Sequence, residues 1–91
     1  MPRPCIRRRI KGNPSSYYFK PAGIPIRNLE ESVLNKPEFE AIRLVDFENL
    51  AQEKAAKEMQ ISQPTLSRIL CSARKKISEA IIKGKAIRIE K

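Results

Sequence analysis

The 91-residue chain contains no histidine, no tryptophan, three glycines and two cysteines. Because Cys5 and Cys71 are isolated and histidine is absent, we expect no zinc site. We find no glycine-rich phosphate loop and no nucleophile–base pair, and therefore expect neither an enzyme nor a cofactor. No stretch approaches the roughly 20 apolar residues that span a bilayer, and no apolar run follows the basic N-terminus. These absences predict a cytoplasmic protein with reduced cysteines and no membrane contact.

Positive charge, in contrast, is abundant and unevenly distributed. The net charge is +9 and the isoelectric point is about 10.0, which is typical of nucleic-acid-binding domains. Residues 1–12 carry five basic residues and no acid, and residues 63–91 carry eight basic residues and two acids. Residues 37–62 carry six acids and three basic residues. A basic membrane-surface helix is a weaker interpretation, because residues 63–83 contain no Trp or Phe.

Residues 52–70, QEKAAKEMQISQPTLSRIL, have the pattern of a helix, a three-residue turn and a second helix. Ser62 is a favourable N-cap, and Pro64 falls in the first turn of the second helix, where its missing N–H costs little. Gln60 occupies the turn position that is usually glycine, and a left-handed backbone there costs about 1 kcal/mol. The pattern as a whole predicts a helix-turn-helix, which binds duplex DNA.

Three helices are predicted. The first starts after Asn35, which forms a capping-box pattern with the acid three residues later, and ends near Phe47. The second covers Gln52–Met59, and the third covers Gln63–Lys83 with Gly84 as its left-handed C-terminal cap. Helical spacing places the following apolar residues of the last two helices in the core: Ala55, Ala56, Met59, Leu66, Ile69, Leu70, Ala73, Ile77, Ala80 and Ile81.

The two ends of the chain differ from this helical centre. Residues 1–34 are predicted to be a basic arm followed by an ordered Pro- and Gly-rich loop, and residues 35–91 a helix-turn-helix domain with a C-terminal strand, within one compact domain. Alternating side chains in 6–10 and 85–90 predict short strands that pair within one chain or between two chains. A short helical turn is expected around 28–33.

The helix-turn-helix pattern and its flanking segments resemble known proteins. Residues 52–77, with their ARKKI ending, look like region 4 of sigma-70-type factors. The segments YFKPAGIP at 18–25, EAIRL at 40–44 and GKAIRIE at 84–90 are similar to a family of short, uncharacterised prokaryotic proteins that are predicted to bind DNA. The resemblance implies a mainly α, sigma-70 region 4-like fold with a long recognition helix and short terminal strands, and a possible regulatory role without a known target.

We predict that the helix at 63–83 enters the major groove by its N-terminal end, capped by Ser62. The residues predicted to contact bases are Gln63, Thr65, Ser67 and Arg68. The residues predicted to contact the DNA backbone are Ser72, Arg74, Lys75 and Lys76. The basic arm, which either enters a minor groove or forms a strand that grips the backbone, contains Arg3, Arg7, Arg8, Arg9 and Lys11.

The predicted function is sequence-specific binding of double-stranded DNA in transcription regulation, by a homodimer on a palindromic site. An alternative is a module that binds RNA polymerase through an acidic helical surface made of Glu38, Glu40, Asp46, Glu48 and Glu58. Nonspecific nucleic-acid binding is a further alternative. Stacking of RNA bases on the aromatic residues at 17–19 is another, although these side chains fit better in the core.

Overall fold

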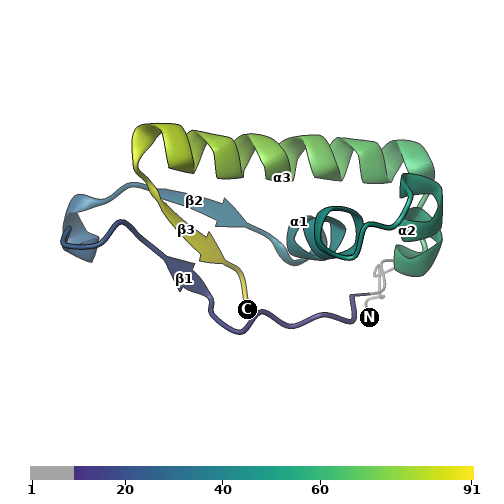
Figure 1. The fold of residues 1–91 in the computed structure, drawn as a ribbon, viewed down its shortest axis with the longest axis horizontal. Helices are drawn as coiled ribbons and strands as arrows, with labels where there is room; N and C mark the ends of the chain where they lie inside the picture. The colour runs from purple at the N-terminus through teal and green to yellow at the C-terminus, as the bar shows by residue number, and fades with distance from the viewer. Residues whose placement is uncertain (1–9) are drawn as a thin grey trace, which may run out of the picture.

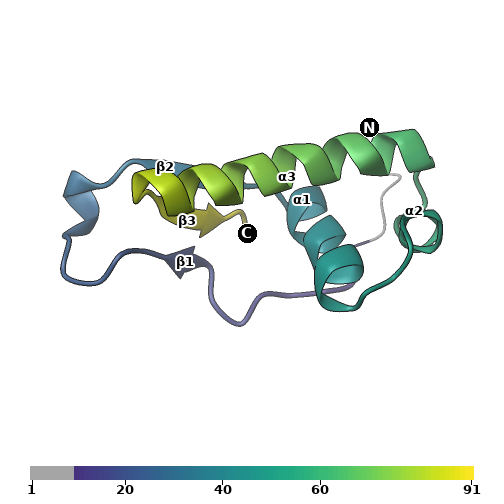
Figure 2. The same cartoon turned by 45° about the horizontal axis from the view of Figure 1, so that its top comes forward.

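A long helix lies across a small sheet and two shorter helical segments in the computed structural model, which describes residues 10–91 (Figure 1). The elements, in chain order, are β1 (Tyr18–Phe19), the 3₁₀ turn η1 (Ile26–Asn28), β2 (Glu31–Leu34), α1 (Lys36–Ala41), the π-helical segment η2 (Ile42–Phe47), α2 (Gln52–Met59), α3 (Gln63–Lys83) and β3 (Ala86–Ile89). Helix α3 covers the sheet with its C-terminal half and packs on α1 and α2 with its N-terminal half (Figure 2).

The first helix begins as predicted, at a capping box. The Asn35 side chain accepts a hydrogen bond from the Glu38 N–H at 2.8 Å, and the Glu38 carboxylate accepts one from the Asn35 N–H at 2.9 Å. The helix continues to Phe47, but its hydrogen bonding changes to the wider π type from Ile42 onward. The predicted bounds of this helix are therefore confirmed, and the change in hydrogen bonding was not predicted.

The predicted helix-turn pair is also confirmed. Gln60 ends α2 in the left-handed conformation, at φ 60° and ψ 44°. The Ser62 hydroxyl caps α3 by accepting a hydrogen bond from the Thr65 N–H at 3.2 Å. Gly84 ends α3 in the left-handed region, at φ 70°. The end of α2 and both ends of α3 thus coincide with local features that the sequence encodes, whereas α2 starts at Ala51 without a side-chain cap.

Two clusters of buried side chains form the core. The first joins α2 to η2 and to the start of α3, and its members are Ala41, Leu44, Ala55, Ala56, Met59, Leu66 and Leu70. The second joins α3 to the sheet through Leu34, Ala73 and Ile89, with Ile77 packed against them. Ile81, which we expected in the core, is 69% exposed. At this end α3 faces only a narrow sheet, which covers Ala80 but not the residue 100° further round the helix.

The sheet differs from the expected pairing of terminal strands. Strand β3 is confirmed close to its predicted position, and it lies in the centre between β1 and β2. It is antiparallel to β1 and parallel to β2, with Val33 opposite Arg88. The strand expected at 6–10 falls almost wholly outside the described residues, and Ile10 is not in a strand. The helical turn expected around 28–33 is wrong except at Asn28, because the 3₁₀ turn η1 covers Ile26–Asn28 and β2 begins at Glu31.

The expectation that residues 17–19 are core holds only in part. Tyr17 is half-buried and packs against the second core cluster, whereas Phe19 is 51% exposed. Tyr18, between them, is half-buried, and its hydroxyl donates a hydrogen bond to the Glu31 carboxylate at 3.1 Å.

The two left-handed residues provide a paired test of stability. Gln60→Gly is expected to stabilise the protein by up to about 1 kcal/mol, because glycine adopts this backbone without the steric cost. Gly84→Ala is expected to destabilise it by about 1 kcal/mol for the converse reason, since an added Cβ meets no atom within 4 Å and only the conformational cost remains. Urea unfolding measures both changes, and effects of the same sign would contradict this account.

Candidate nucleic-acid interface

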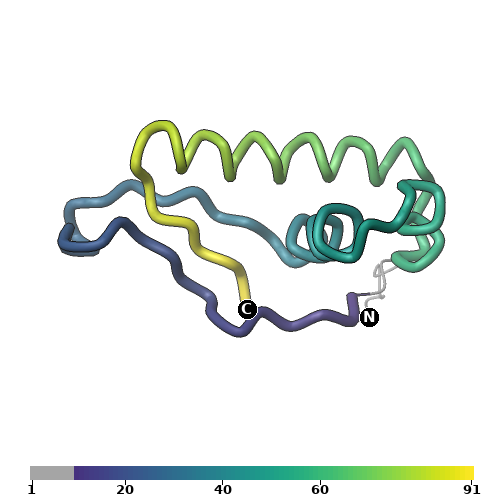
Figure 3. The backbone as a smooth tube through the Cα atoms, viewed as in Figure 1, coloured from purple at the N-terminus to yellow at the C-terminus, as the bar shows by residue number. Residues whose placement is uncertain are grey.

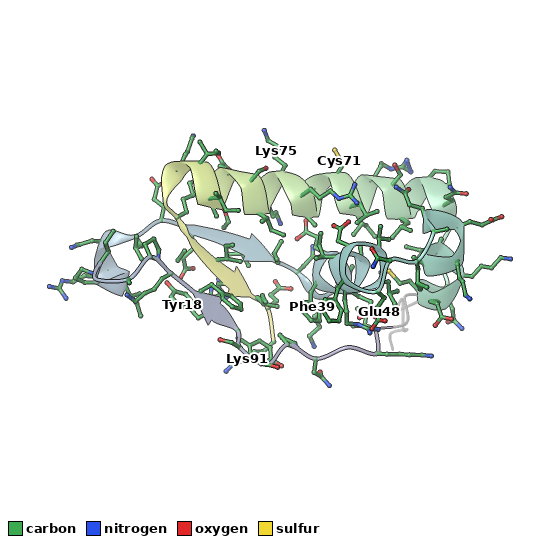
Figure 4. The ribbon with its side chains drawn as sticks, in the orientation of Figure 1. Tyr18, Phe39, Glu48, Cys71, Lys75 and Lys91 are labelled. Carbon is green, nitrogen blue, oxygen red and sulfur yellow. The ribbon has the colours of Figure 1, made fainter. Side chains whose placement is uncertain are left out.

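One side of α3 is exposed along most of the helix, while the opposite side packs on the core. We call this side the outer face of α3 and define it by its exposed residues: Gln63, Pro64, Ser67, Arg68, Cys71, Arg74, Lys75 and Ser78. Figure 4 shows the side chains of Cys71 and Lys75 pointing away from the rest of the molecule. Residues 63–78 contain no Asp or Glu, so the outer face is positive and polar.

The four predicted base-contacting residues do not lie in equivalent positions. Gln63, Ser67 and Arg68 are exposed on the outer face, and Arg68 makes no ion pair within residues 10–91. Thr65 is half-buried, and its hydroxyl oxygen accepts a hydrogen bond from the Ser62 hydroxyl at 2.8 Å. Thr65 therefore belongs to the helix cap, and only Gln63, Ser67 and Arg68 of the four are exposed.

The predicted backbone-contacting residues also differ, because some are exposed without a partner among the described residues and others are hydrogen-bonded within the protein. Lys75 lies on the outer face and is exposed. Lys76 donates to the Glu38 carboxylate and to the Val33 carbonyl, both at 2.8 Å, and the Ser72 hydroxyl also donates to Glu38. Lys76 and Ser72 are thus held by contacts inside the protein.

Arg74 lies on the outer face but has an acidic partner. Its guanidinium donates to both carboxylate oxygens of Asp46, at 2.6 and 3.2 Å. This hydrogen-bonded pair raises the pKa of Arg74 above its ordinary value. The pair connects α3 to the end of η2 and partly neutralises this section of the outer face.

Two acids of the predicted acidic surface are buried, so that prediction is wrong for them. Glu38 is 3% exposed and Glu40 is 1% exposed. Burial favours the neutral form of Glu38, but hydrogen bonds from Lys76, Ser72 and the Asn35 N–H outweigh it and lower its pKa. Burial acts in the same direction on Glu40, and hydrogen bonds from Arg43 and from two backbone N–H groups lower its pKa. Both carboxylates are held ionised inside the fold.

Only one residue of the basic arm lies within the described residues. Lys11 is exposed, and its ammonium group lies 3.6 Å from the carboxylate of Glu58 on α2. The other arm residues, Arg3 and Arg7 to Arg9, lie outside the described part of the chain.

Other kinds of site have little support in residues 10–91. The structure brings together no group of three or more potential metal ligands there, and Cys71 is an exposed free thiol. No described helix is long and apolar enough to cross a membrane. We take the outer face of α3 as the candidate functional surface because it is exposed, free of acids and positive.

Sequence comparison places the chain in a family. The family described as "Protein of unknown function DUF134" matches residues 1–91. This chain belongs to that family. A UPF0251 protein of Moorella thermoacetica is 56% identical over 90 residues, which cover 99% of this chain and 60% of the relative. UPF0251 proteins of Caldanaerobacter subterraneus and Dehalococcoides mccartyi are 52% and 53% identical over 90 residues, which cover 76% and 77% of those relatives.

The DUF134 chain therefore spans three fifths of the Moorella protein and about three quarters of the other two. No solved structure matches the chain significantly. The descriptions of the family and of these relatives name no ligand and no activity.

The ion pairs that the acidic residues form within the protein were not predicted from the sequence. Apart from the capping box, Glu38, Glu40 and Asp46 were expected only on an exposed acidic surface, and their pairing with basic residues of the protein was not predicted. The Glu40–Arg43 pair has i, i+3 spacing, which is a recognisable signal for an ion pair on a helix. The Asp46–Arg74 and Glu38–Lys76 pairs join residues that are distant in sequence, and no local pattern identifies them.

The buried carboxylates make the stability of this protein sensitive to acid. Because the folded-state pKa values of Glu38 and Glu40 are lowered, their stabilisation is complete above the unfolded-state pKa of roughly 4.3 and is lost as the pH falls through the folded-state values. Thermal unfolding should therefore show a midpoint that decreases progressively below about pH 4.

Glu38→Gln is the variant that identifies the source of this loss. It should cost roughly 1–3 kcal/mol at neutral pH, because Lys76 loses its charged partner. It should also reduce the dependence of the midpoint on pH in the acid range. An unchanged acid profile in this variant would show that Glu38 is not responsible.

Proposed function

We propose that this protein binds double-stranded DNA sequence-specifically, as a regulator of transcription, and that the N-terminal half of α3 reads the major groove. The observation that carries the proposal is the outer face of α3, which is exposed, free of acids and positive. A helix with its side chains is about 10–12 Å across, close to the roughly 12 Å width of the major groove. The preceding turn and α2 lie at the end of α3 that would enter first.

Three side chains near the start of α3 have the chemistry for base recognition. Gln63 is able to form a bidentate pair with adenine, and Arg68 with the O6 and N7 atoms of guanine. Ser67 lies between them on the outer face and reaches either a base or a phosphate. Thr65 contributes by fixing the cap from which the helix starts.

Phosphate contacts are assigned further along the helix. Lys75 is exposed on the outer face, and Arg74 keeps its charge on this side despite its pairing with Asp46. The arm residues Arg3 and Arg7 to Arg9 add positive charge that would hold a neighbouring stretch of backbone or enter a minor groove. Ser72 and Lys76 are left out of this surface because Glu38 holds them.

A homodimer is part of the proposal, and the exposed apolar residues support it. Phe19, Ile24, Ile26, Ile81 and Ile82 are exposed in the half of the molecule formed by β1, η1 and the end of α3, opposite α2 (Figure 1). From Arg68 to Ile82 the helix rises roughly 21 Å. Two copies that meet at Ile82 with crossed helices can therefore place their reading ends one helical turn of DNA apart, roughly 34–36 Å.

The proposal is tested by selection from a pool of random duplexes at two salt concentrations, with sequencing of the bound fraction. Enrichment of one motif is expected, and a palindromic motif would support the dimer. Lys36→Ala, which removes an exposed lysine at the start of α1 and lies off the outer face of α3, is the control variant and should select the same motif. Strongly salt-dependent binding without enrichment of a motif would indicate that the protein binds nucleic acids nonspecifically.

Two substitutions on the outer face separate base reading from backbone binding. Arg68→Ala is expected to relax preference at one base position and to cost roughly 1–3 kcal/mol on the selected motif. Lys75→Ala is expected to weaken binding to all duplexes alike. It is also expected to lower the slope of log binding constant against log salt concentration by about one unit. Fluorescence anisotropy on the selected and on random duplexes measures both effects. Identical behaviour of the two variants on the two duplexes would remove Arg68 from the base-reading role.

A further inference from the structure

An ion pair at the outer face of α3 holds one arginine in a defined orientation. The Arg74 guanidinium donates to Asp46 through Nε, at 3.2 Å, and through Nη2, at 2.6 Å. These two nitrogens form one edge of the planar guanidinium, and each meets a different oxygen of the same carboxylate. Such a bidentate pair fixes the plane of the guanidinium as well as its position.

A second edge of the same guanidinium remains available. Within residues 10–91, the side chain of Arg74 makes no hydrogen bond other than those to Asp46. Its Nη1 group and the second N–H of Nη2 form another fork, which fits two oxygens of a phosphate group. The side chain of Arg74 is 49% exposed, so a ligand at the surface has access to it.

The core keeps the partner carboxylate in place. Asp46 lies in η2, the π-helical segment that runs beneath the N-terminal half of α3 (Figure 3). Its neighbour Leu44 is buried in the first core cluster, and Val45 packs against that cluster. The Leu50 N–H donates to the Leu44 carbonyl at 3.0 Å, which fixes the end of the segment. Because the side chain of aspartate is short, a backbone held in this way determines where the carboxylate lies.

The position of Arg74 along α3 suits a contact with the DNA backbone. From Arg68, the proposed base reader, to Arg74 the helix rises about 9 Å. The major groove is about 8.5 Å deep. If α3 enters the groove by its N-terminal end, Arg74 therefore comes to lie at about the level of the phosphates.

We propose that Asp46 is a positioning residue for DNA binding, which directs the second edge of the Arg74 guanidinium at a phosphate. This inference rests on the proposed DNA binding. A long side chain that is free in solution has to be ordered when it binds, and that ordering weakens binding by roughly two- to tenfold for each side chain. Asp46 orders Arg74 before DNA arrives, so an acid on a positive surface strengthens the binding of an anion.

A masking role for Asp46 would have the opposite effect. A carboxylate close to a phosphate repels it and neutralises the neighbouring arginine, so its removal would strengthen binding. The two roles differ in the sign of one measurable quantity. Asp46→Asn reveals that sign, because it keeps the size of the side chain but removes the charge and one of the two acceptor oxygens.

The sheet supplies a matched control pair. The Arg88 Nε donates to Glu31 at 2.9 Å, and the two side chains are 46% and 32% exposed, compared with 49% and 39% for Arg74 and Asp46. Ile87 packs against the second core cluster, so the adjacent Arg88 lies on the side of β3 that faces away from that cluster. Glu31→Gln and Arg88→Ala therefore make the same charge changes away from the outer face of α3.

The test measures the binding of the whole 91-residue chain to a random duplex by fluorescence anisotropy, at several salt concentrations. Asp46→Asn is made in the natural sequence and in the Arg74→Ala variant, and Glu31→Gln is made in the natural sequence and in the Arg88→Ala variant. Asp46→Glu, which keeps the carboxylate, is the conservative variant. Thermal unfolding confirms that each variant is folded at the temperature of the binding measurement.

Arg74→Ala is expected to lower the slope of log binding constant against log salt concentration by about one unit, because one phosphate contact is lost. Compared with its effect in the Arg74→Ala variant, Asp46→Asn in the natural chain is expected to weaken binding roughly two- to tenfold. Asp46→Glu should retain most of the affinity, since its carboxylate is able to pair with Arg74. The cycle of Glu31→Gln and Arg88→Ala should show no coupling.

Four results would overturn the inference. Stronger binding by Asp46→Asn in the natural chain than in the Arg74→Ala variant would show that Asp46 masks Arg74. An equal effect in both chains, or the same coupling in the control cycle, would show that Asp46 does not position Arg74. Unchanged affinity and salt dependence in Arg74→Ala would remove Arg74 from the phosphate contacts while leaving the proposed DNA binding intact. A natural chain that binds no duplex even at low salt would instead overturn the proposed function, and this inference with it.

Discussion

The ionised carboxylate of Glu38 is the interaction on which the arrangement of the elements depends. It accepts a hydrogen bond from the N–H of Asn35 at the start of α1. It also accepts hydrogen bonds from the side chains of Lys76 and Ser72 on α3. Lys76 in turn donates to the Val33 carbonyl of β2. One buried charge thus connects the first helix, the long helix and the sheet. Unpaired buried charge is strongly unfavourable, so these elements have to meet in one geometry for the charge to be satisfied.

This internal use of charge determines which charges remain at the surface. Glu38 and Glu40 are buried, and Asp46 is paired with Arg74. The outer face of α3 is consequently left with an excess of positive groups, although the preceding segment is rich in acids. The acids of α1 and η2 therefore hold the fold together, and the predicted acidic docking surface is reduced to Asp46, Glu48 and Glu58, each of which is paired with a basic residue.

The parts of the fold that were predicted correctly are encoded locally. The Asn35 capping box, the Ser62 cap, the left-handed Gln60 and the Gly84 cap each involve residues within a few positions of one another. The parts of the fold that were not predicted depend on interactions with residues that are distant in the sequence. The strand β2 contains Glu31 and Ser32 and has only four residues, so its pattern is weak until β3 pairs with it. The exposure of Ile81 depends on the width of the sheet. The helical spacing of apolar residues gives no information about that width.

The order of the strands has a consequence for how the chain folds. The central strand β3 follows both of its neighbours in the sequence, and it pairs residues 86–89 with residues 31–34. During synthesis on the ribosome, the two outer strands therefore emerge long before the strand that joins them. Helix α2 and the start of α3 are neighbours in the sequence as well as in space, which favours early folding of that pair. The sheet requires pairing between residues far apart in the sequence, so we expect it to form after this helix pair.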